Sequence, residues 1–76
     1  MVTPENVMKQ TLILKFNENL ADLSNAENEH DRSWFYAYSK GFLSAIFELA
    51  DFTQTEIEDM AEQLDRVDRT WEINHA

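Results

Sequence analysis

The chain has 76 residues, of which 15 are acidic and 6 basic, so its formal net charge at neutral pH is −9. Nucleic acid and anionic membrane surfaces repel such a chain, which argues against direct binding to either and favours a protein partner with a basic surface. The chain contains no cysteine, which excludes disulfides, thiolate metal sites and thiol nucleophiles. We expect residues 1–76 to form one domain with a thin core.

Localisation follows from the same features. A small secreted domain usually needs disulfides, and residues 1–10 lack the basic and apolar pattern of a signal peptide, so we expect a cytoplasmic protein. The most apolar stretch, residues 34–50, is interrupted by Lys40 and Glu48 and falls short of the ~20 apolar residues that a membrane span requires.

The first predicted element is a helix over residues 4–23. Thr3 is the candidate N-cap, and Pro4 suits the first helical position, where a missing N–H costs nothing. Residues 11–16 are rich in β-formers and could form a short strand, but no partner strand is evident. The buried stripe of this helix is predicted from apolar residues at a spacing of three and four: Ile13, Phe16, Leu20 and Leu23.

The second predicted helix spans residues 25–51, and its start is open to two interpretations. Ser24 and Glu27 match a capping box, whereas Asp31 is a second candidate cap further along. The polar residues 25–32 are therefore either a connection or a solvent-exposed first turn.

This second helix carries more apolar surface than one core can absorb. Twelve of the seventeen residues from Trp34 to Ala50 are apolar, so the helix is apolar nearly all round. It could simply be a central helix flanked by the other two. Two amphipathic neighbours cannot easily cover three sides, however, so we expect a surface for self-association or for a partner. The small residues Ala37, Gly41 and Ala45 would allow close approach, and Trp34, Tyr38 and Phe42 are the predicted aromatic anchors.

The third predicted helix spans residues 54–72 and has the clearest start. Thr53 and Glu56 form a capping box, with Phe52 and Ile57 placed as a hydrophobic staple. Its apolar seam, which in a longer chain would indicate a coiled coil, is predicted to be the core face: Ile57, Met60, Leu64, Val67 and Trp71. Together these elements predict an all-α, antiparallel three-helix bundle, possibly dimeric.

No recognisable catalytic or metal motif occurs. Glu27 and His30 have the Glu-x-x-His spacing of di-iron bundles, but such sites need two of these motifs and further glutamates. One glycine cannot build a phosphate-binding loop, and no serine sits in a nucleophile elbow. We therefore expect neither enzyme activity nor a cofactor.

Charge is concentrated in the last third of the chain, where residues 52–76 hold seven acids and two bases. Glu58, Glu62 and Asp65 are predicted to stack opposite the apolar seam, so charge reversal there should leave the fold intact. Asp59 is added to this candidate partner-binding face. Regularly spaced carboxylates can imitate a phosphate backbone, although a solvated face that serves only solubility explains them too.

The leading hypothesis is a small helical inhibitor or regulator that occupies a basic, nucleic-acid-binding surface of a protein partner. In size and charge the chain resembles the small acidic proteins of phages and mobile elements that inhibit host enzymes, anti-CRISPR proteins among them, but no motif carries this resemblance. The alternative is a homodimeric structural or regulatory module whose acidity only provides solubility.

Overall fold

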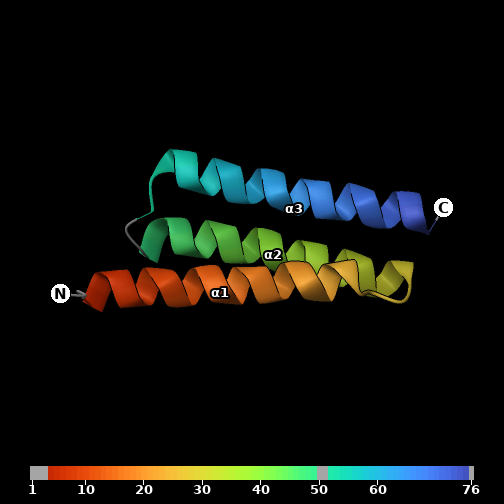
Figure 1. Ribbon diagram of the computed structural model, residues 1–76, viewed down its shortest axis with the longest axis horizontal. Helices are drawn as coiled ribbons and strands as arrows, with labels where there is room; N and C mark the ends of the chain where they lie inside the picture. The colour runs from red at the N-terminus through yellow and green to blue at the C-terminus, as the bar shows by residue number, and fades with distance from the viewer. Residues whose placement is uncertain (1–3, 50–51, 76) are drawn as a thin grey trace.

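The computed structural model describes residues 4–49 and 52–75, and it forms an up-down-up bundle of three helices (Figure 1). These are α1 (Pro4–Ser24), α2 (Glu29–Leu49) and α3 (Gln54–Asn74). Each helix packs against both others, and no strand occurs within the described residues. The predicted helical fold is therefore confirmed, and residues 11–16 are helical rather than extended. The predicted cap at Thr3 and the predicted end near Asp51 lie outside the described residues.

The core lies between the three helices, and the stripes predicted for the first and third helices contribute to it together with residues of α2. Phe16 and Leu23 of α1 are almost fully buried, and Ile13 and Leu20 pack against them. On α3, Leu64 is fully buried, and the other seam residues are buried or packed on the core. The continuous apolar cluster consists of Phe16, Leu23, Leu43, Ile46, Phe52, Met60 and Leu64.

The start of α2 differs from both sequence interpretations. Asn28 is the cap, because its side-chain oxygen accepts a hydrogen bond from the backbone N–H of Asp31 at 2.8 Å. Ser24 instead ends α1, so no capping box forms between Ser24 and Glu27. Extending α1 to Ser24 keeps Leu23 in the core and buries Ala26 within an otherwise exposed turn, so packing prevails over the local capping signal.

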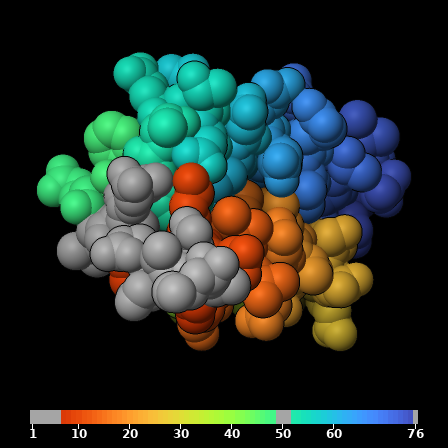
Figure 2. All heavy atoms as spheres, turned by 60° about the vertical axis from the view of Figure 1, so that its left-hand side comes forward, coloured from red at the N-terminus to blue at the C-terminus, as the bar shows by residue number. Residues whose placement is uncertain are grey.

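The start of α3 matches its prediction. The Thr53 hydroxyl accepts from the Glu56 N–H at 3.2 Å, and the Glu56 carboxylate accepts from the Thr53 N–H at 3.0 Å. Lys9 of α1 donates to the same carboxylate, 2.7 Å away, and together these donors lower the pKa of Glu56. Figure 2 shows α1 and α3 side by side at this end of the bundle.

Thr53→Ala removes the acceptor of this capping box. We expect it to lower the free energy of unfolding by about 1 kcal/mol, the usual cost of losing an N-cap side chain. Urea unfolding followed by circular dichroism checks this. Thr55→Ala is the control, because Thr55 is exposed, lies in the first turn of α3 and makes no capping bond. Equal effects of the two changes would contradict the cap.

Ser39 is the one buried polar side chain among the described residues, and its hydroxyl has no hydrogen-bond partner. An unpaired buried hydroxyl is destabilising, so Ser39→Ala should raise the free energy of unfolding by about 1 kcal/mol. Thermal unfolding checks this, with the exposed Ser44→Ala as control. A lower melting temperature for Ser39→Ala would show that the hydroxyl finds a partner in solution.

Candidate partner-binding groove

A continuous groove runs between α2 and α3. Two hollows of about 590 and 600 Å³ follow one another along it and share Glu58 and Ala61. The first hollow, which we call the apolar half, has Leu43, Phe47, Ile57 and Ala61 in its lining. The second, the acidic half, has Tyr36, Glu58, Glu62, Asp65 and Asp68 in its lining. Lys40 and Glu48 border the first hollow and Arg69 borders the second, so the groove as a whole carries five carboxylates and two cations.

Asp65 of α3 faces α2 across this groove, and a hydrogen bond holds its carboxylate in place. The Tyr36 hydroxyl of α2 donates to its carboxylate at 2.8 Å, and this hydrogen bond raises the pKa of Tyr36. Asp65 is half-buried rather than fully exposed. The expectation that it points away from the fold is therefore wrong, and its reversal would break a contact between helices.

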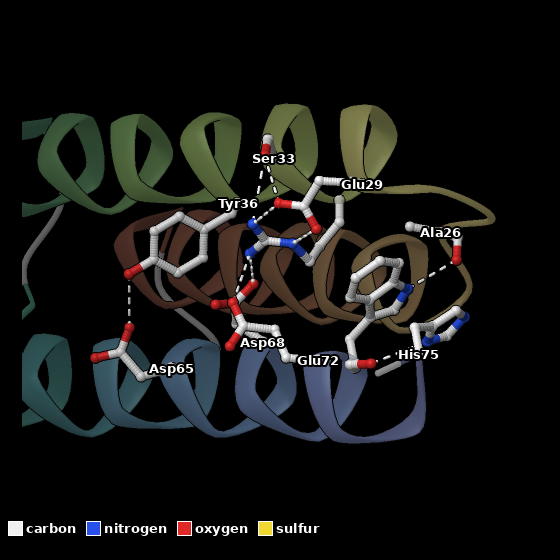
Figure 3. Close-up of polar contacts among 10 residues, drawn as sticks. Ala26, Glu29, Ser33, Tyr36, Asp65, Asp68, Glu72 and His75 are labelled. Atoms are coloured by element: carbon white, nitrogen blue, oxygen red, sulfur yellow. Dashed lines mark hydrogen bonds and ion pairs between the residues drawn. The ribbon is translucent and has the colours of Figure 1, made fainter.

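Arg32 of α2 pairs with carboxylates near the connection between α1 and α2, and Asp68 of the acidic half is one of them (Figure 3). Its guanidinium pairs with Glu29 of α2 and with Asp68 of α3, and Glu72 lies 3.5 Å away. These bonds lower the pKa of Glu29 and raise that of Arg32. Asp68 and Glu72 are thus engaged in an interhelical ion cluster and are not free to meet a partner.

Trp71 lies beside this cluster and links α3 to the connection between α1 and α2. Its indole N–H donates to the Ala26 carbonyl at 2.8 Å, while the His75 ring stacks on it with centroids 4.0 Å apart. The guanidinium carbon of Arg32 lies 5.5 Å from the centroid of the indole ring. The contacts at this end therefore fasten α3 to α2 and to the connection between α1 and α2.

Glu58 and Glu62 remain as exposed carboxylates of the groove. Glu58 accepts from the Gln54 amide at 3.0 Å, and Glu62 pairs with Arg66 at 2.9 Å within the same helix. Both contacts are solvent-exposed and local, so a partner cation can replace them at little cost. Asp59 is not part of this group: it borders a separate hollow between α1 and α3.

The predicted aromatic anchors separate into two groups. Trp34 and Tyr38 are 57% and 50% exposed and stack on each other, with ring centroids 5.3 Å apart. Phe42 instead packs against the core and stacks on Phe16 of α1 at 6.5 Å. None of the three lines the α2/α3 groove. The structure therefore does not bring the acidic face and the aromatic anchors together.

Two groove aromatics, Tyr36 and Phe47, were missed as site residues. Both belong to the apolar run of the second predicted helix, but sequence alone does not show which of its residues turn towards α3. Phe47 is 49% exposed although it lines the apolar half.

Within the described residues, no group of three or more acidic or histidine side chains is placed to hold a metal ion. In that same part of the chain, no helix is long and apolar enough to cross a membrane. Comparisons with protein-family models, with curated proteins and with solved structures find no match for this chain.

Proposed function

We propose that this protein is a small inhibitor or regulator that binds a basic, nucleic-acid-binding surface of a partner protein through the α2/α3 groove. The observation that supports the proposal is that some carboxylates form ion pairs between helices while others remain exposed on the groove. Those near Arg32 stabilise the fold, whereas Glu58 and Glu62 stay exposed along one groove. A phage or mobile-element protein directed against host defence would have this kind of activity.

Electrostatics explains how such a protein would work. A chain with a net charge of −9 and a line of surface carboxylates attracts basic surfaces from a distance and speeds encounter. A bound partner would have its nucleic-acid-binding residues covered. Inhibition then needs no catalytic group, because occupancy of the surface is sufficient.

Competition with nucleic acid tests this proposal. The tagged protein is immobilised, partners are captured from cells of its native host, and double-stranded DNA is added in excess. DNA should release the captured partner, because both ligands require the same basic surface, while neutral dextran should not. A partner that stays bound in excess DNA would contradict the proposal.

A second candidate function is self-association through the outer face of α2. Half-exposed Trp34 and Tyr38 favour it, and so does Gly41, where an added Cβ would meet nothing within 4 Å. Light scattering at high concentration tests it. A stable dimer that Gly41→Leu abolishes and Ser44→Leu retains would support this candidate, and a monomer at every concentration would contradict it.

A further inference from the structure

We infer that the element of the partner that enters the α2/α3 groove is a basic amphipathic helix. Its apolar side chains occupy the apolar half of the groove, and its lysine or arginine side chains face the acidic half. This inference rests on the proposed function and specifies what the basic surface of the partner looks like.

The apolar half of the groove is suited to an apolar side chain of the partner. Phe47 is a large side chain left half-exposed beside Ile57, which is itself only partly buried. Ala61 lies between them and the acidic half, and its small side chain leaves the groove open at this point. An apolar side chain from the partner would cover the exposed ring and remove apolar surface from water.

The acidic half of the groove is suited to lysine or arginine side chains that directly follow this apolar side chain in the partner. Glu58 belongs to the lining of both halves, and Glu62 follows one turn further along α3. The lining of the groove holds five carboxylates against two cations, and although Arg32 pairs with Asp68 and Arg66 pairs with Glu62, it keeps an excess of negative charge. Charge complementarity therefore selects a positively charged segment over a neutral apolar one.

The backbone around the groove determines the form of that segment. Both walls are α-helices, whose N–H and C=O groups are already paired, so an extended peptide would find no strand edge to pair with. A helix brings its own backbone hydrogen bonds and needs only side-chain contacts. From Gln54 to Arg69 the groove follows fifteen residue steps of α3, about 22 Å, which suits a helix of about four turns.

Synthetic peptides test this inference. The probe is a fluorescein-labelled, alanine-based helix of about four turns, with two leucines one turn apart at one end and three lysines along the same face of the rest. One control peptide has alanine in place of both leucines, and the other has glutamate in place of the lysines. Fluorescence anisotropy should show the probe binding about tenfold more tightly than the leucine-free peptide, with no binding of the glutamate peptide.

Variants of the protein locate the binding. Phe47→Ala should weaken the probe about tenfold and leave the leucine-free peptide unchanged. Trp34→Ala is the matched control, since it removes a similarly exposed aromatic ring outside the groove, and it should change neither. Melting temperatures of both variants verify that each is folded.

The outcomes separate the two proposals. Equal binding of the probe and the leucine-free peptide, or loss of the probe in Trp34→Ala instead of Phe47→Ala, overturns the helix inference while the basic partner stands. Failure of both lysine peptides to bind also overturns the inference. The proposed function is tested separately, since it falls if excess DNA leaves the captured partner bound, whatever the peptides do.

Discussion

Trp71→Ala should remove a large share of the free energy of unfolding. Trp71 is only 6% exposed, and its indole N–H is bonded to the Ala26 carbonyl. Truncating a buried tryptophan costs about 3–5 kcal/mol, and a domain of this size has roughly 4–11 kcal/mol in total. We therefore expect the melting temperature to fall by roughly 12–40 °C, on the basis of about 4–8 °C for each kcal/mol. Differential scanning calorimetry measures this.

Two further tryptophan variants complete this experiment. Trp71→Phe keeps most of the ring but leaves the Ala26 carbonyl without its donor, so it should cost about 1–3 kcal/mol. Trp34→Ala removes a ring that is 57% exposed and should change the stability much less than either. Equal losses of unfolding free energy in Trp34→Ala and Trp71→Ala would contradict the assignment of Trp71 as the residue that fastens α3 to the connection between α1 and α2.

The fold could be predicted because local signals and tertiary packing agree over most of the chain. The Thr53 capping box and the seam through Leu64 are local patterns, and the structure keeps both. The start of α2 could not be predicted, because Ser24, Asn28 and Asp31 all have capping side chains. The choice depends on burying Leu23 and Ala26, and the Ala26 carbonyl accepts a hydrogen bond from Trp71, 45 residues further along the sequence.

The candidate site was only partly predictable for a related reason. Helical spacing identifies Glu58 and Glu62 on one face, and both lie on the groove. Spacing within α3 does not show which residues of α2 lie opposite, so the bond from Tyr36 to Asp65 and the position of Phe47 were missed. The excess apolar surface of α2 was correctly expected, but part of it, Phe42, serves the core instead.

Reversing Glu58 and Glu62 to lysine should abolish partner binding with little loss of stability. Like charges opposite a basic partner cost several kcal/mol, so we expect the affinity to fall by about a hundredfold or more. Asp65 is left unchanged because it accepts the Tyr36 hydroxyl. Both substituted positions are exposed and the lost Glu62–Arg66 pair is local, so the free energy of unfolding should change by no more than about 0.5–1 kcal/mol.

The matched control reverses Glu18 and Asp22 on α1. This pair has the same spacing along its helix, is exposed, and changes the net charge by the same amount. Titration calorimetry with the captured partner compares the two double variants. If both weaken binding alike, only the overall charge matters and the groove is not the site. If neither does, the acidity serves solubility, and the Trp34 and Tyr38 face of α2 becomes the better candidate.

The salt dependence of partner binding tests the central claim most directly. The dissociation constant of the captured partner is measured from about 0.05 to about 0.3 M NaCl, a range over which the screening length falls from about 14 Å to about 6 Å. Binding of a basic surface by the acidic half should weaken steeply over this range, by at least about tenfold. A dissociation constant that stays constant over this range would contradict the account, and it would favour association through the apolar face of α2.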